Sequence, residues 1–529
     1  MLKLSRLLAA ALVLLAAAST YAQSDPGDEA GGRVVLVLPF ENRSGQPSLN
    51  WVSDSFPDTL NARLSSAGFL TITRDDRQFA LDHLGLPTDF RPTRATTIQI
   101  AQTLDANFVV VGSFNVQDNH IQVQAQVLDI NKLRLSAPLN DSTELAQLLD
   151  IENATAWKLA RQIDPHFSVA LQTFLAASAG VRLDSYENYI RGIDETTPQQ
   201  RVKFLQAAVQ SSPTYAAALL ALGRQQFADR DYDQAATTLA KVPQNDRLAL
   251  EAGFFRGLAR FNESKYAEAE QAFAFVATRL PLPEVVNNEG VAATRQGHDG
   301  TAIFQRAVNA DPTDPDYHFN LAIALYRRGD MAGAKREIAA TLKVKPKDNE
   351  AVAFQARITD GAKPAASGSS AADPIERVRR TYSEASFRQA AFQLDQMRGL
   401  RLATLPPAQQ ASEYSQLGRD YLAQGLLPEA EQEFQSAIHA DPTSPLGHAG
   451  LAQVREQSGD NAEARTEAQN SINLKPSAAA YIVLGRLDLQ ANKLAESATD
   501  IANALKLEPK NSAAIGMKAA LQSRGQTLP

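Results

Sequence analysis

A stretch of 32 residues, 411–442, constrains the fold of this chain more than any other part, because small and large side chains recur in it at fixed spacings. Its sequence is ASEYSQLGRDYLAQGLLPEAEQEFQSAIHADP. Counted from Ala411, small residues stand at positions 8, 20 and 27, and large apolar residues stand at positions 7, 11 and 24. Small side chains let two antiparallel helices approach closely, while the large ones fill the space between them. Gly425 fits the turn between the helices, and Pro442 follows the second helix, which it cannot continue.

This spacing resembles that of the tetratricopeptide repeat (TPR), a helix–turn–helix unit of about 34 residues that stacks on copies of itself. Prolines that would follow the second helix of a repeat are Pro213, Pro281, Pro312, Pro346, Pro442, Pro476 and Pro509, and the steps 312→346 and 442→476 are 34 residues while 476→509 is 33. The resemblance implies an all-α solenoid in two arrays, over residues 165–358 and 374–525. A single helix over residues 511–524 would cap the exposed end of the second array.

Before the repeats, strand signals alternate with helix signals. Residues 33–40 (RVVLVLPF) form a β-branched run that is typical of a buried parallel strand. Residues 107–116 and 120–130 predict a hairpin, whose second strand alternates between apolar and polar residues. A helix over residues 145–163 would close a small α/β domain, residues 32–164. The expected fold class of the chain is therefore multidomain α+β, with this domain followed by the helical solenoid.

The phrase LPFENRSG after the first strand, and VVVGSF with IQVQAQVLDI at the end, give this domain a further resemblance. They are similar to the α/β modules of the TolB amino-terminal and FlgO/CsgG-like envelope families. In those families the module is an assembly or docking domain of the bacterial envelope, and the resemblance implies that role here. Repeats follow the module in this chain where TolB has a β-propeller, so the partners of TolB are not implied.

The first residues have the features of a secretory signal. Lys3 and Arg6 precede an apolar run, residues 7–18, and the triplet TYA then fits an A-x-A-like cleavage site. The run is shorter than the roughly 20 residues that span a bilayer, which favours a cleaved signal over a retained anchor. We expect a signal peptide over residues 1–22, a polar linker over 23–31, and a mature protein in the periplasm.

Between the two predicted arrays lies TDGAKPAASGSSAAD, residues 359–373, whose composition is that of a flexible linker. Helices are expected over residues 374–400, as a divergent repeat that opens the second array. This region is rich in arginine: Arg377, Arg379, Arg380, Arg388, Arg398 and Arg401. The arginines are expected on a helix surface, paired with Glu376 and Glu384, or alternatively as a docking site for an acidic partner.

Composition and motifs argue against several classes of function. The chain has no cysteine and a net charge of −7, which exclude thiolate metal sites and give no electrostatic footprint for nucleic acid. The phosphate-binding, hydrolase, metalloprotease and calcium-loop motifs are missing, and the seven histidines do not cluster in the sequence. We therefore expect no catalytic residue, no cofactor and no metal site, and hence no enzyme.

In TPR proteins the concave groove is lined by residues of the first helix of each repeat. In this chain several of these lining positions hold aromatic or arginine side chains. The residues expected to contact a partner are Arg224, Phe227, Phe254, Phe261, Phe319 and Tyr326 in the first array, and Arg419 and Arg486 in the second. Phe227, Phe261 and Tyr326 have an alternative role, because they could replace a missing tyrosine and pack inside the repeats.

These observations predict a non-enzymatic periplasmic scaffold or adaptor whose repeats bind other proteins or peptides in the cell envelope. Binding energy in such grooves comes from a few buried aromatic or arginine anchors. The alternative is an envelope sensor, whose α/β domain binds a small ligand and whose repeats relay the signal. A cleft with convergent polar groups in residues 32–164 would favour the sensor, and a filled core there would favour the scaffold.

Overall fold

A computed structural model of the chain describes residues 33–86, 93–176, 180–362, 374–381 and 384–529. The predicted signal peptide, the linker over residues 23–31 and most of the predicted linker between the arrays, residues 363–373, lie outside the described residues. Within the described part of the chain, no helix combines the length and the apolar character needed to cross a membrane.

The N-terminal domain is built on a mixed sheet. Its seven described strands are β1 (Val34–Val37), β2 (Glu41–Asn42), β3 (Leu70–Thr71), β4 (Phe108–Gln117), β5 (His120–Asp129), β6 (Arg134–Leu135) and β7 (Leu139–Glu144). β1 lies between β3 and β4 and is parallel to both, as its run of buried residues predicts. β4 and β5 form the predicted hairpin, which turns at Asp118 and Asn119, two residues with positive φ.

Helices cover both faces of this sheet. The helices are α2 (Trp51–Ser66), α3 (Arg74–His83), α4 (Arg94–Thr103) and α5 (Leu148–Ile163). Side chains alternate along β1, so Val35 and Val37 pack with α2 and α5, while Leu36 and Leu38 pack with α4. The core is filled by aromatic rings, with Phe40 stacked on Phe56 at 4.1 Å between ring centroids.

The core of this domain continues into the first helices of the solenoid. Three helices follow α5: α6 (Leu171–Ala176), α7 (Leu183–Asp194) and α8 (Pro198–Ser211). α7 packs against α2 and buries Tyr186 completely, so that the Tyr186 hydroxyl lies 3.0 Å from a carboxylate oxygen of Glu152 on α5. The boundary predicted at residue 164 therefore does not separate two cores, because α7 completes the α/β domain.

Glu152 is a buried carboxyl group inside this shared core. It accepts hydrogen bonds from Thr59 at 2.7 Å, from Tyr186, and from Ser55. Burial raises the pKa of Glu152 from 4.5 to about 7, although the three hydroxyl groups oppose the shift. A carboxyl group with a raised pKa binds more protons in the folded state, so it makes the fold less stable as the pH rises from about 4.5 to 7.

We predict that Glu152→Gln removes this pH dependence. Relative to the wild type, the variant should gain stability as the pH rises through 7, by about 2–3 kcal/mol, since one pKa unit corresponds to about 1.4 kcal/mol. Denaturant unfolding at pH 5 and pH 8 measures the difference, with Glu144→Gln on the exposed edge of β7 as control. If the free energy of unfolding depended on pH equally in the wild type and the Glu152 variant, the raised pKa of Glu152 would be contradicted.

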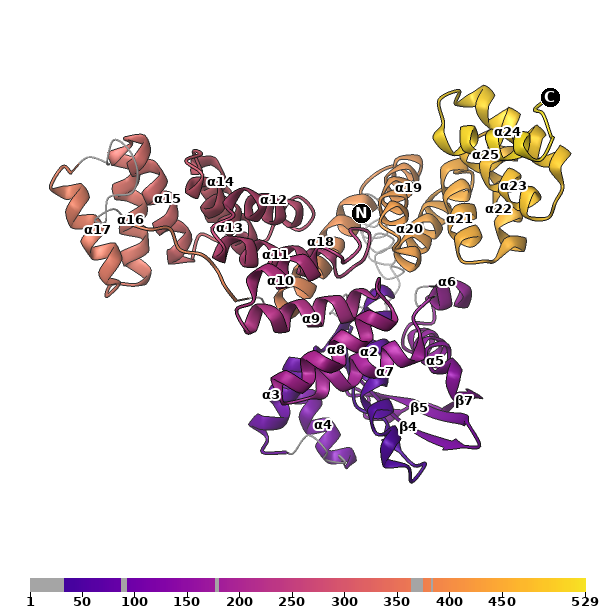
Figure 1. Cartoon of the computed structure of the whole chain (residues 1–529), viewed down its shortest axis with the longest axis horizontal. Helices are drawn as coiled ribbons and strands as arrows, with labels where there is room; N and C mark the ends of the chain where they lie inside the picture. The colour runs from indigo at the N-terminus through magenta and orange to yellow at the C-terminus, as the bar shows by residue number, and fades with distance from the viewer. Residues whose placement is uncertain (1–32, 87–92, 177–179, 363–373, 382–383) are drawn as a thin grey trace, which may run out of the picture.

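The first array is a run of antiparallel helix pairs that extends away from the α/β domain (Figure 1). Its helices are α9 (Ala216–Ala228), α10 (Tyr232–Leu239), α11 (Ala249–Asn262), α12 (Tyr266–Ala277), α13 (Pro283–Arg295), α14 (Thr301–Ala310), α15 (Pro315–Arg328), α16 (Met331–Val344) and α17 (Asn349–Thr359). Small residues allow the close approach that the sequence predicted: a Cβ atom added to Gly257 would lie 2.6 Å from the Phe273 ring.

The second array forms the other arm in Figure 1. Its helices are α18 (Glu384–Ala403), α19 (Pro407–Ala423), α20 (Leu427–Ala440), α21 (Pro445–Gln457), α22 (Asn461–Leu474), α23 (Ala478–Gln490), α24 (Leu494–Leu507) and α25 (Ser512–Ser523). α25 is the predicted capping helix. The region over residues 374–400 differs from its prediction, because residues 374–381 form no helix and α18 is one long helix.

Close packing in the second array gives a test of the repeat register. A Cβ atom added to Gly418 on α19 would lie 2.7 Å from the ring of Phe434 on α20, which is fully buried. We predict that Gly418→Leu destabilises the protein by about 1–3 kcal/mol, the usual cost of overpacking. Gly516 on α25 has no heavy atom within 4 Å of such a Cβ, so Gly516→Leu is the matched control. A thermal melt in which both variants behave alike would show that the register is wrong.

Candidate functional site

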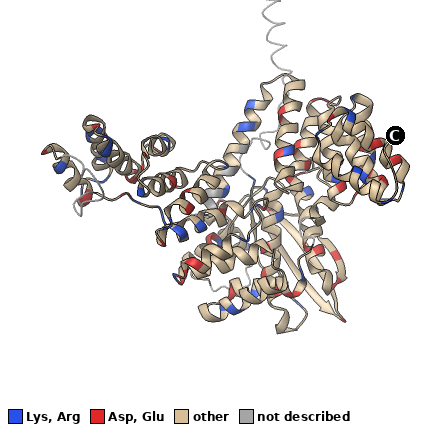
Figure 2. Cartoon of the chain, turned by 45° about the horizontal axis from the view of Figure 1, so that its top comes forward, with Lys and Arg blue, Asp and Glu red and all other residues tan. Residues whose placement is uncertain are grey.

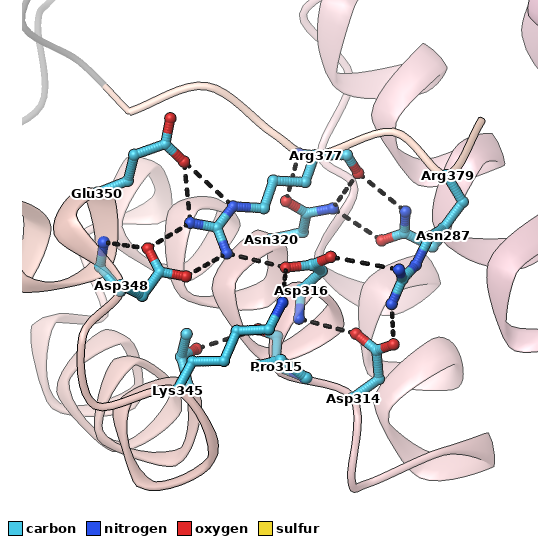
Figure 3. A network of polar contacts seen from close by, with 12 residues as sticks. Asn287, Asp314, Pro315, Asp316, Asn320, Lys345, Asp348, Glu350, Arg377 and Arg379 are labelled. Atoms are coloured by element: carbon cyan, nitrogen blue, oxygen red, sulfur yellow. Dashed lines mark hydrogen bonds and ion pairs between the residues drawn. The ribbon is translucent and has the colours of Figure 1, made fainter. Parts of the chain in front are cut away.

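Residues 374–381 lie across the inner face of the first array, although the sequence placed them in the second. The segment passes over first helices of successive repeats, α13 and α15, and reaches the start of α17 (Figure 3). Val378 packs against the apolar core cluster of the array. A piece of the same chain therefore covers the first helices of the array. We call the surface formed by the array residues that it contacts the groove, and residues 374–380 the groove segment.

Three asparagines hold the main chain of the groove segment. Asn320 on α15 accepts from the Arg377 amide at 2.7 Å and donates to the Arg377 carbonyl at 2.8 Å, and Asn287 on α13 donates to the same carbonyl at 3.0 Å. Asn288 repeats the arrangement one step further along, accepting from the Arg379 amide and donating to the Arg379 carbonyl, both at 2.8 Å. Alternate residues of the segment are thus clamped through their backbone.

The stability of the helices alone does not explain why asparagine stands at these three positions. Asparagine is a weak helix former, and a buried polar side chain without a partner is costly. Asn287, Asn288 and Asn320 are all fully buried, and Asn320 also donates to Asn287 at 2.8 Å. Their remaining hydrogen-bonding groups are satisfied by the groove segment. Hydrogen bonds to an extended backbone in the groove therefore offset the cost of burying these polar side chains in the array.

Arg377 makes the largest set of side-chain contacts in the groove (Figure 3). Its guanidinium donates two bonds to Asp348, both at 2.8 Å, one to Asp316 at 2.9 Å, and two to Glu350, at 2.9 and 3.2 Å. It also lies over the Phe319 ring, 3.8 Å from the ring centroid. Burial alone would lower the pKa of Arg377, but the hydrogen bonds that it donates to Asp348, Asp316 and Glu350 raise the pKa above its ordinary value. In return, the hydrogen bonds from Arg377 lower the pKa of Asp348.

Glu376 and Arg379 of the groove segment are also paired. Arg379 pairs with Asp314 and lies 3.5 Å from Asp316. Glu376 points into the array, where its side chain is 1% exposed and pairs with Arg327 and with Arg295, the latter at 3.4 Å. The groove therefore has an acidic side for the arginines and a basic site for the glutamate.

Two parts of the chain match known repeat sequences. The family description Tetratricopeptide repeat fits residues 295–358, in the first array beside the groove, and residues 415–479, in the second array. Both arrays contain TPRs. This agrees with the helix pairs and the glycine packing described above.

Solved structures show partial likenesses. The chain is similar to a TPR protein from Parabacteroides merdae at 13% identity, over 57% of this chain and 97% of that chain, with a TM-score of 0.25. MamA from Desulfovibrio magneticus RS-1 is 17% identical over 34% of this chain and 99% of its own, with a TM-score of 0.28. The C-terminal domain of LpoB from Salmonella enterica is 22% identical over 21% of this chain and 83% of its own, with a TM-score of 0.19. Comparison with curated proteins gave no match.

The residues that the sequence placed in the TPR groove of the first array have different surroundings. Phe319 is buried against Phe354, and its ring lies beneath the Arg377 guanidinium. Phe254 and Tyr326 are buried in the array, against Phe273 and Phe354 respectively. The half-buried residues Phe227 and Phe261 pack on the tyrosines that begin the following helices, and Arg224 pairs with Glu251. The aromatic residues thus mostly follow the alternative of internal packing.

In the second array the two predicted residues lie in separate surroundings. Arg419 donates to Gln416 on its own helix. Arg486 pairs with Glu456 at 2.8 Å, where burial raises the pKa of Glu456 to about 7 although Arg486 opposes the shift. Whether Arg419 and Arg486 contact a partner stays a prediction.

The arginine-rich region has a different arrangement from either expectation. Arg377 and Arg379 dock on acidic residues, but those residues belong to the same chain. Arg388, on α18, donates to Thr71 of the α/β domain, and Arg401 lies 3.6 Å from Glu413. The predicted partner Glu376 pairs with arginines of the array instead, because the segment is not helical. The side chain of Glu384, the other predicted partner, lies outside the described residues.

Sequence reasoning missed the asparagines and the acidic side of the groove. One signal was present: Asn287 and Asn320 are 33 residues apart, which is about one repeat. Asparagines at equivalent places inside the first helices of successive repeats are unfavourable for the helix and so indicate another role. The acidic residues carried no such signal, because Asp314 and Asp348 also serve as helix caps.

Two of the seven histidines have equivalent structural positions in the TPRs. His318 and His448, at equivalent places in the two arrays, each contact a glutamate of the next helix, Glu337 at 2.6 Å and Glu467 at 2.5 Å. Each also contacts the carbonyl of the proline six residues earlier. Among the described residues there is no group of three or more His, Cys, Asp and Glu side chains that could hold a metal ion.

A cavity of about 340 Å³ lies where the α/β domain and the two arrays meet. Its charged lining includes Arg63 from α2, Asp246 and Arg247 from the loop between α10 and α11, and Glu429 from α20. Burial raises the pKa of Asp246, with Arg247 and Arg63 opposing the shift. The convergent polar groups are thus found between the domains, while the sheet of the α/β domain has a filled core.

Proposed function

We propose that this protein is a non-enzymatic scaffold or adaptor of the bacterial cell envelope, and that its first TPR array binds protein segments in an extended conformation. The observation that carries the proposal is the set of paired hydrogen bonds from Asn287, Asn288 and Asn320 to the backbone of Arg377 and Arg379. Backbone clamps of this kind bind any extended chain whose side chains fit.

The envelope location rests on the sequence. The apolar run over residues 7–18 and the site before Gln23 support export, and the resemblance of residues 32–164 to the TolB amino-terminal and FlgO/CsgG-like modules supports docking in the envelope. The mature protein should begin at Gln23 and be recovered in the periplasmic fraction. N-terminal sequencing tests this, and an intact Met1 in the cytosolic fraction would contradict it.

The groove itself can be tested with asparagine variants. The tagged full chain would be crosslinked to its neighbours in envelope preparations, as wild type and as Asn287→Ala/Asn320→Ala. Partners held in the groove should be retained by the wild type and lost with the variant. The matched control is Asn309→Ala/Asn473→Ala, two exposed asparagines that each bond a glutamine on their own helix. A set of partners that is unchanged in the groove variant would overturn the proposal for the first array.

The alternative function, an envelope sensor, draws on the cavity at the junction of the three parts. A charged ligand there would contact Arg63 and Arg247 and would link the arrays to the α/β domain. Thermal shift against a panel of small anions and sugars, compared between wild type and Arg247→Ala, would support it through a shift that the variant loses. Without such a shift the scaffold remains the better account.

A further inference from the structure

The side chains of the groove segment indicate which sequences fit the groove, which the backbone hydrogen bonds alone do not. Arg377 and Arg379 are two residues apart and so lie on one side of an extended chain, the side that faces Asp314, Asp316 and Asp348. Glu376 and Val378 lie on the other side, in contact with Arg327 and with the apolar core cluster. The groove thus matches a four-residue pattern of glutamate, arginine, an apolar residue and arginine.

The groove segment is held as a ligand would be. It belongs to no helix and to no strand of the sheet. Its contacts with the array include the asparagine clamps, the ion pairs, the packing of Val378, the contacts of Arg377 and Arg379 with the Phe319 and Tyr317 rings, and a hydrogen bond from Arg380 to Asn262. Ile375, at its start, is 61% exposed. Leaving the groove would therefore break these contacts without unwinding a helix. Residues 360–373 join the segment to α17, which lies beside the groove, so the segment stays near its site after release.

We propose that the first array takes a partner protein through a segment of the form Glu-Arg-apolar-Arg, and that residues 374–380 are a built-in competitor which this partner displaces. The inference rests on the proposed function, since it names the ligand chemistry of the same groove. A tether of this length gives an effective concentration on the order of 1 mM. If the groove segment itself binds the open groove with a Kd of about 10 µM, a partner segment would then bind the wild type about 100-fold more weakly than it binds an open groove.

Binding of a labelled synthetic peptide, PIERVRR, to the full chain tests the proposal. In Arg377→Glu/Arg379→Glu, the reversed charges should be repelled by Asp316 and Asp348, which opens the groove without altering it. We expect this variant to bind the peptide about 100-fold more tightly than the wild type does. The charge-matched control is Lys335→Glu/Arg336→Glu on the exposed side of α16, which should bind like the wild type.

Two further binding measurements distinguish the ways in which the proposal could fail. The opened variant should not bind PIEEVER, in which glutamate replaces the arginines equivalent to Arg377 and Arg379, and should lose PIERVRR when Asn287→Ala/Asn320→Ala is added. If it binds PIEEVER as well as PIERVRR, the arginine preference is wrong while the proposed function stands. If it binds neither peptide, the groove does not accept extended segments from outside, and the proposed function fails for this array too. Equal affinity of the wild type and the opened variant would show that the segment is no competitor.

A measurement on the wild type guards against a folding defect in the variant. Saturating PIERVRR should displace the groove segment, so amide hydrogen exchange in residues 374–380 should speed up at least about 10-fold, while exchange in α15 stays slow. Unchanged exchange in the segment at a peptide concentration that saturates binding would overturn the displacement.

Discussion

Phe254→Ala is expected to lower the free energy of unfolding by about 3–5 kcal/mol, the usual range when a buried phenylalanine is truncated. Phe254 on α11 is fully buried and packs on Phe255 and Phe273, with ring centroids 5.8 and 6.0 Å away. The cavity would open between α11 and α12, at the centre of the array. Denaturant unfolding measures the loss.

The same variant tests the role that the sequence suggested for Phe254. Partner capture should fall only to the extent that the protein unfolds, because the ring is not accessible to a ligand. Phe79→Ala is the matched control, since that ring is 69% exposed on α3 and should change stability little. If Phe254→Ala left the melting temperature intact and abolished capture, Phe254 would have to line the groove, and the packing of the first array described here would be wrong.

The second large effect is expected at the contact between the second array and the α/β domain. Glu431 on α20 has a fully buried side chain that pairs with Arg455 on α21 at 2.9 Å. It also accepts from the Ala170 amide at 2.7 Å and from Thr173, both of which belong to the region of α6. Burial raises the pKa of Glu431 although Arg455 opposes the shift, so this carboxylate depends on its partners.

Glu431→Ala should remove this contact and leave Arg455 buried without its partner, at a cost of about 3–5 kcal/mol. Most of the cost is avoided if the second array moves away from α6, so we expect a larger radius of gyration by X-ray scattering and an earlier thermal transition. Glu413→Ala, an exposed residue on α19, is the control. Scattering curves that superimpose for wild type and Glu431→Ala would mean that α6 does not hold the second array.

Much of the fold is encoded in local patterns, which is why it could be predicted from the sequence. The alternation in residues 120–130 fixes which side chains of β5 face the core, and Asp118 and Asn119 supply the turn. In the repeats, glycines such as Gly418 stand where only a hydrogen atom fits against a ring of the next helix. Each of these features depends on residues that are close in the chain.

What could not be predicted depends on residues that are far apart in the chain. Arg377 bonds Asn320, 57 residues earlier, and Asn287, 90 residues earlier, and nothing near Arg377 indicates either contact. Judged locally, the arginine-rich stretch resembles a helix surface. The core shared by the α/β domain and α7 could not be predicted for the same reason, because Tyr186 completes the α/β domain through a contact with Ser55, 131 residues away.

The same limit applies to the residues that the sequence assigned to the groove of the first array. Phe319 is buried in the array with its ring beneath Arg377, and the repeat register alone gives no information on what covers that ring. Aromatic residues attract notice as binding anchors, yet Phe254 and Tyr326 are needed inside the array. The polar residues that hold the groove segment, Asn288 and Asn320, become significant only when the segment is seen between them.

The most direct test of this account is amide hydrogen exchange of the groove segment in the full-length protein without any added ligand. The Arg377 and Arg379 amides donate to Asn320 and Asn288, so both should exchange at least about 100-fold more slowly than amides of an unstructured chain, and Asn287→Ala/Asn320→Ala should abolish the protection. Exchange of both amides at the rate of an unstructured chain in the wild type would show that the groove is empty in solution, and would contradict the account.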